Sequence, residues 1–138
     1  MGQIFIRSHR GLLAVGATFA MLCGAAFSAT AENSSLEGSW SGSGTVTFPS
    51  GGTEAARCKA SFRRESDDKF AMNALCATPS GKVAQTAQLE RIGGNRFSGD
   101  FQNSEYGIAG QINIVIRGNS LSAALNGGGA TASLKLSK

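Results

Sequence analysis

Cys58 and Cys76 are the two side chains in this sequence best placed for covalent chemistry. Apolar and polar residues alternate along residues 56–63 and 70–76, as in two half-buried strands joined by a short turn. If that turn is centred on Asp67, the two cysteines lie opposite each other on the inner side of the hairpin. A CxxC spacing or a nearby histidine would favour a redox or metal pair, and neither is present. We therefore predict a structural disulfide, which for a loop of this length stabilises the fold by about 3 kcal/mol.

Residues suited to acid–base or nucleophilic catalysis are few. The single histidine, His9, lies in the N-terminal segment described below. The acids Glu90, Asp100 and Glu105 fall on outward or turn positions without a buried partner, and no His, Cys or acidic cluster has the spacing of a metal site. The sequence predicts a protein that is not an enzyme and that uses no metal or cofactor.

The first 31 residues have the pattern of a secretory signal peptide. Basic side chains precede an apolar run over residues 11–27, and Ala29-Thr30-Ala31 has the small-residue pattern of a cleavage site. The run is short and rich in Gly and Ala for a membrane span. We predict cleavage after Ala31, which leaves one domain, residues 32–138, in the periplasm or secreted. A retained N-terminal anchor is the alternative.

The charge of this domain is modest. Removal of Arg7 and Arg10 leaves eleven of the thirteen basic residues against nine acids, so the net charge falls from +4 to about +2. Nucleic-acid-binding domains usually concentrate basic residues on one face together with aromatic side chains, and this chain has one Trp and one Tyr. We predict no nucleic-acid partner.

Alternation of apolar and polar residues is the main evidence for the fold. It is unbroken from Leu36 to Phe48, which indicates one half-buried strand. The same pattern recurs in seven further segments: residues 56–63, 70–76, 82–91, 96–102, 108–117, 121–125 and 130–136. Short connections favour pairing between sequence neighbours, and closing the sheet pairs its edges and buries its apolar face. The prediction is an eight-stranded antiparallel up-and-down β-barrel; a two-sheet β-sandwich is the alternative.

The polarity of the two faces bears on the environment of the barrel. Polar and charged side chains such as Arg57, Lys82 and Glu90 fall on the outer face, whereas a membrane-spanning barrel is apolar outside. We therefore expect a domain that does not span the membrane once the signal peptide is removed.

The inner face combines large rings with many small residues. An eight-stranded barrel is either filled by side chains or holds one small ligand. Trp40 is expected either to close one end of the barrel or to form a pocket wall. The candidate pocket for a small apolar ligand consists of Trp40, Phe48, Phe62, Phe70, Met72, Phe97 and Phe101.

The outer face carries a second candidate site. Three cations, Arg57, Lys59 and Arg63, lie in a row on one strand. In the predicted register they lie opposite Thr45, Ser43 and Ser39 of the first strand, and no carboxylate is adjacent to them. This candidate anion or partner surface consists of Arg57, Lys59, Arg63, Ser39, Ser43 and Thr45. Such a row suits an anionic envelope component or an acidic protein. An ordinary solvated face is the alternative.

The opening residues Leu36-Glu37-Gly38-Ser39-Trp40, with their Gly-x-Trp element at the start of a small meander barrel, resemble the start of calycins: lipocalins, avidins and bacterial metalloprotease inhibitors. The resemblance to the inhibitors implies an exported eight-stranded barrel with one disulfide. From these observations we expect a non-enzymatic exported binding or interaction module of the bacterial envelope that contacts a protein or an anionic component through its outer face. A carrier of a small apolar ligand and a protease inhibitor are the alternatives.

Overall fold

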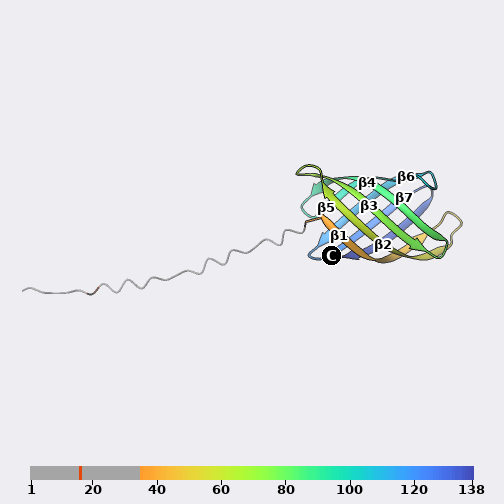
Figure 1. Cartoon of the computed structure of the whole chain (residues 1–138), viewed down its shortest axis with the longest axis horizontal. Coiled ribbons are helices and arrows are strands. Elements are labelled where there is room, and N and C mark those ends of the chain that lie inside the picture. The colour runs from red at the N-terminus through yellow and green to blue at the C-terminus, as the bar shows by residue number, and fades with distance from the viewer. Residues whose placement is uncertain (1–15, 17–34) are drawn as a thin grey trace, which may run out of the picture.

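The chain forms a closed barrel of eight antiparallel strands, as predicted (Figure 1). The computed structural model describes residues 35–138 and, in isolation, residue 16, so the predicted signal peptide and its cleavage site lie outside the described residues. Each strand pairs with its sequence neighbours, and the last strand closes on the first. The strands are β1 (Gly38–Thr47), β2 (Thr53–Arg64), β3 (Lys69–Thr78), β4 (Gly81–Gly93), β5 (Arg96–Asn103), β6 (Ile108–Arg117), β7 (Ser120–Gly127) and β8 (Ala130–Ser137). No helix within this described part is long and apolar enough to cross a membrane.

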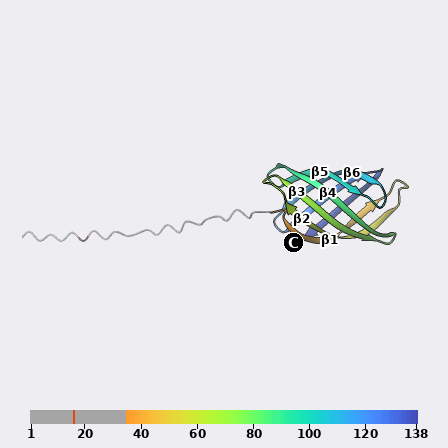
Figure 2. The ribbon, with the colours of Figure 1, turned by 45° about the horizontal axis from the view of Figure 1, so that its top comes forward.

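The two ends of the barrel differ in what they carry. One end, here called the base, holds the start of β1, the end of β8 and the β2–β3, β4–β5 and β6–β7 turns. Figures 1 and 2 both show the C terminus at this end, beside the point where the chain enters β1. The opposite end, here called the mouth, is formed by the β1–β2, β3–β4, β5–β6 and β7–β8 loops. Because every connection is short, successive loops lie alternately at opposite ends of the barrel.

The β2–β3 hairpin has the predicted register. Phe62 pairs with Met72 and Cys58 with Cys76, which places the turn around Asp67. All four paired side chains are at most 6 % exposed. The inner face of this hairpin and the position of its turn are therefore confirmed.

The β1–β2 register differs from the predicted one by two residues. Ser43, and not Thr45, lies opposite Arg57. The chain reverses direction between β1 and β2 within residues 48–52. In this loop Gly51 adopts a φ of 87°, which residues with a side chain rarely adopt. A shift of two residues keeps every side chain on its own face of the sheet, so the inward and outward assignments are unchanged.

The base of the barrel is filled by side chains. Trp40, Leu36, Phe70, Phe97 and Ile116 are each at most 1 % exposed. The indole Nε1 of Trp40 donates a hydrogen bond to the Leu36 carbonyl oxygen at 2.9 Å, which satisfies its one polar atom in the core. Phe70 and Phe97 pack edge to face, with ring centroids 5.3 Å apart. Trp40 therefore closes one end of the barrel.

Inward-facing glycines permit close approach of neighbouring strands. A Cβ atom on Gly44 would lie 1.9 Å from the Ser133 carbonyl oxygen, and one on Gly99 would lie 1.8 Å from that of Gln88. Both distances are far below van der Waals contact. These glycines let the sheet bend sharply enough to close at eight strands, because only glycine fits where two backbones approach so closely.

Candidate ligand-binding cavity

The mouth half of the barrel encloses a cavity of about 370 Å³. Its wall is mainly apolar and comes from inward-facing positions on all eight strands and from the mouth loops. The apolar lining residues are Val46, Phe48, Pro49, Ala56, Val83, Phe101, Ile108, Leu125, Ala130, Ala132 and Leu134, together with the sulfur-bearing Cys58 and Cys76. The filled base and this cavity divide the barrel into a closed half and a hollow half.

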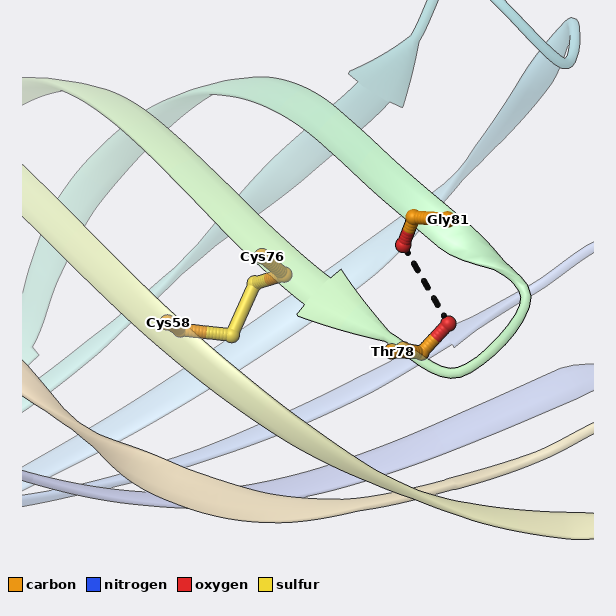
Figure 3. Close-up of a disulfide and its surroundings, with 4 residues drawn as sticks. All are labelled: Cys58, Cys76, Thr78 and Gly81. Carbon is orange, nitrogen blue, oxygen red and sulfur yellow. Dashed lines mark hydrogen bonds between the residues drawn. A yellow bond between two sulfur atoms is a disulfide. The ribbon is translucent and has the colours of Figure 1, made fainter.

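The predicted disulfide between Cys58 and Cys76 is present and forms part of the cavity wall. It joins directly opposed residues of β2 and β3, whose Cα atoms are 4.1 Å apart (Figure 3). Two residues beyond Cys76, the Thr78 hydroxyl donates a hydrogen bond to the Gly81 carbonyl oxygen at 3.3 Å across the β3–β4 turn. The disulfide and this hydrogen bond hold one side of the mouth in place.

Polar side chains interrupt the apolar wall at a few points. Thr78, Gln85 and Asn103 line the cavity from inward-facing positions. Asn103 is 4 % exposed, and its Oδ1 accepts hydrogen bonds from the backbone N–H groups of Glu105 and Tyr106, which shapes the β5–β6 loop. A cavity with apolar walls and a few placed hydrogen-bonding groups is the usual form of a small-molecule site.

Gln85 and Asn103 are absent from the pocket predicted from the sequence, which contains only aromatic residues and Met72. The sequence does carry the signal, because Gln85 lies two residues from both Val83 and Ala87, and Asn103 lies two residues after Phe101, so both amides share the inward face.

Glu54 is the charged residue on the inner face at the mouth. Its Oε1 accepts a hydrogen bond from the Ser80 hydroxyl, whereas its Oε2 is buried without a hydrogen-bond partner among the described residues. The hydrogen bond from Ser80 lowers the pKa of the Glu54 carboxyl, burial opposes this shift, and Thr78 contributes further lowering. The carboxylate is therefore ionised at neutral pH and gives the mouth a negative charge. No group of three or more His, Cys, Asp or Glu residues in positions 35–138 is arranged to hold a metal ion.

The seven residues of the aromatic candidate pocket fall in both halves of the barrel. Phe48 and Phe101 line the cavity. The other five belong to the buried core outside the lining of the cavity: Trp40, Phe62, Phe70, Met72 and Phe97. Alternation along a strand shows which side chains face inward, whereas their height along the barrel axis depends on register and strand tilt.

The basic row lies on the exposed outer face of β2, as expected. Arg63 is not isolated from carboxylates, because its guanidinium lies 3.6 Å from the Glu65 carboxylate in the following turn. Arg57 lies opposite Ser43, and Lys59 lies opposite Ser41. The expectation that no acid neighbours the row is therefore wrong at Arg63, since residues two apart come together where the strand ends and the hairpin turns.

A shallow, open groove of about 580 Å³ crosses the outer face of β1 to β4. Of the predicted outer surface, it includes Lys59 and Ser39 but none of Arg57, Arg63, Ser43 or Thr45. Leu75, which is 49 % exposed, adds an apolar contact to its lining. The structure thus separates the six predicted residues into two that line the groove and four that do not.

Comparison with known proteins identifies the architecture. No protein-family model matches the chain, and no curated protein sequence matches it. Among solved structures it is similar to the redesigned β-barrel mFAP1 bound to DFHBI, with a TM-score of 0.64 and 15 % identity over 75 % of this chain and 94 % of that one. The redesigned β-barrel mFAP0 bound to DFHBI gives a TM-score of 0.62 and 15 % identity over 75 % and 98 % of the two chains. A de novo designed fluorescence-activating β-barrel gives a TM-score of 0.59 and 13 % identity over 75 % and 93 %. At these identities the similarity establishes the fold, which is a small closed eight-stranded meander β-barrel.

Proposed function

We propose that this protein is a non-enzymatic binding protein that holds one small, largely apolar molecule in the mouth half of its barrel. The observation that carries the proposal is the 370 Å³ cavity with mainly apolar walls. Its volume is near the lower end of the usual range for small-molecule pockets and corresponds to about a dozen water molecules. The ligand is therefore small.

The structural neighbours support this proposal. The solved structures of mFAP1 and mFAP0 are each bound to the small molecule DFHBI, so a barrel of this architecture is able to hold such a ligand. Burial of about 200 Å² of apolar ligand surface would contribute about 5 kcal/mol, part of which offsets the entropy lost on association. Because about 5 kcal/mol corresponds to a dissociation constant of about 0.2 mM, we expect dissociation constants of about 0.2 mM or higher.

We further propose that the protein acts outside the cytoplasm, as the predicted signal peptide and the calycin-like opening suggest. The Cys58–Cys76 disulfide supports this location, because disulfides form and persist in oxidising compartments. The polar groups of the cavity wall are amides and hydroxyls. Such groups orient a ligand by hydrogen bonding but do not exchange protons readily at neutral pH, which supports binding without catalysis.

A fluorescent probe tests the binding site directly. N-phenyl-1-naphthylamine, an uncharged dye that becomes bright in apolar surroundings, should bind the wild-type protein saturably. Ala132→Phe and Val83→Phe each place a ring in the cavity and should each weaken binding at least tenfold. Ala124→Phe is the matched control, because Ala124 is exposed on the outer face of β7. Circular dichroism establishes that each variant is folded. Unchanged dye affinity in a folded Ala132→Phe or Val83→Phe variant would refute the proposal.

The outer groove is a second candidate site, favoured by Lys59 and the half-exposed Leu75 in its lining. A cation beside hydroxyl groups suits an anionic envelope component or an acidic protein. The test is capture of envelope extract by the wild-type protein and by a variant in which Arg57, Lys59 and Arg63 are replaced by Glu. Capture that is unaffected by this charge reversal eliminates the outer site.

A further inference from the structure

We infer that the cavity favours ligands whose polar group is an uncharged hydrogen-bonding group, such as an alcohol or an amide, and that Gln85 is the residue that determines this preference. The inference rests on the proposed function, since it names the class of ligand held in the same cavity.

Gln85 lies on the inner wall at the point where β4 passes the cavity. It pairs with Ala74 of β3, a small residue that leaves its side chain room. On the other side, Thr86 pairs with Gln102 of β5, so continuing this register by one pair places Asn103 beside Gln85. Two amide side chains therefore lie next to each other within an otherwise apolar wall.

Among the polar side chains that line the cavity from inward-facing strand positions, Gln85 is the one whose donor and acceptor both lack a hydrogen bond within the described residues; the unbonded hydroxyls of Tyr106 and Thr131 belong to residues exposed at the mouth. Thr78 uses its hydroxyl hydrogen on the Gly81 carbonyl oxygen, and Asn103 uses its Oδ1 on two backbone N–H groups. Within residues 35–138 the side-chain amide of Gln85 forms no hydrogen bond, although the residue is half-buried. Partly buried amides normally find partners, and this one offers both a donor and an acceptor. A hydroxyl or amide group of a ligand would satisfy it.

The charges around the cavity disfavour an anionic ligand. In the described chain, no lysine, arginine or histidine lines the cavity. Lys82, the cation nearest to it along β4, lies on the exposed outer face. Glu54 adds a negative charge at the mouth, and its Oε1 is already bonded to Ser80. A carboxylate or phosphate entering the cavity would lose its hydration without gaining a cation, which is strongly unfavourable.

The same arrangement gives little advantage to a cationic ligand. Glu54 is the acidic residue closest to the mouth on the inner face, yet it is not part of the cavity lining. A protonated amine held in the cavity would therefore remain separated from that carboxylate. Uncharged ligands gain the apolar wall and the Gln85 amide without such a desolvation cost.

The test compares ligands that differ only in the polar group. Decan-1-ol and decanoate are titrated at pH 8, where decanoate is ionised, against protein loaded with N-phenyl-1-naphthylamine. We expect decan-1-ol to displace the dye at a concentration at least tenfold lower than decanoate. Gln85→Leu should weaken decan-1-ol binding relative to dye binding three- to tenfold. Gln88→Leu is the matched control, because Gln88 is exposed on the outer face of the same strand.

Several results would overturn the inference while leaving the proposed function intact. These are equal displacement by decanoate and decan-1-ol, failure of decan-1-ol to displace a cavity-bound dye, and an alcohol affinity unchanged relative to the dye affinity in folded Gln85→Leu. Tighter binding of decylamine than of decan-1-ol, with the advantage lost in Glu54→Gln, would also overturn it, because Glu54 would then set the preference. Gln85→Met is measured alongside, so that the result does not depend on one variant. Failure of the dye to bind the wild-type protein, or unchanged dye binding in the cavity-blocking variants, refutes the proposed function itself.

Discussion

Replacement of both Cys58 and Cys76 by alanine should lower the free energy of unfolding by about 3 kcal/mol. The disulfide spans 18 residues of sequence. In the chain-entropy model, releasing a loop of this length returns about 3 kcal/mol of conformational freedom to the unfolded chain. A domain of residues 35–138 has an unfolding entropy of about 0.22 kcal/mol/K, so the melting temperature should fall by about 14 °C.

The measurement is urea and thermal denaturation of both proteins, followed by far-ultraviolet circular dichroism. A double replacement of Ser61 and Asn73 by alanine is the matched control, because this pair lies opposite each other on the exposed face of the same hairpin. The control should change stability by less than about 0.5 kcal/mol. A loss below about 1 kcal/mol in the cysteine variant would show that the reduced unfolded chain already keeps this hairpin together, and the loop-entropy argument would be wrong.

Three further predictions concern the strands and the mouth. Gly44→Ala should lower the free energy of unfolding by about 2 kcal/mol or more, because the added Cβ would overlap a neighbouring carbonyl oxygen. Gly93→Ala is the control and should be nearly neutral, because a Cβ there meets open space. Urea denaturation measures both variants. Trp40→Phe should cost about 1–2 kcal/mol in the same assay, since it leaves the Leu36 carbonyl without its hydrogen bond; an unchanged midpoint would contradict this. The lowered pKa of Glu54 means that its contribution to stability is complete above the unfolded-state value of about 4.3 and is lost as pH falls through the lower folded-state value. Glu54→Gln should therefore reduce the loss of stability on acidification, and an identical pH profile would disprove the linkage.

The β2–β3 hairpin shows how far sequence reasoning reaches. Alternation and one turn position were sufficient to predict the pairing of Cys58 with Cys76, because a strand has a side-chain period of two and a short hairpin has few registers. The β1–β2 hairpin shows the limit. The loop between these strands contains glycines, so the chain can reverse direction over different numbers of residues. The predicted pairing of Arg57 with Thr45 is therefore off by two residues.

The candidate site was predictable only in part, for a related reason. Phe48 and Phe101 were placed inside the barrel correctly and do line the cavity, but Trp40 and Phe97 also face inward and lie in the filled base. Inward direction is a local property of a strand. Whether an inward side chain meets other rings or open space depends on which residues of the remaining strands lie at the same height.

The sequence by itself determined the number of strands, the inward and outward faces, the cysteine pair and the meander order, because each follows from a period of two and from short connections. Only the tertiary structure decided that the base is filled and that a cavity of about 370 Å³ remains at the mouth. It also decided that Gln85 lies in the cavity wall with an amide that forms no hydrogen bond among the described residues. Free volume is the space left after all eight strands have packed at their particular tilt and register, so no single segment of the chain encodes it.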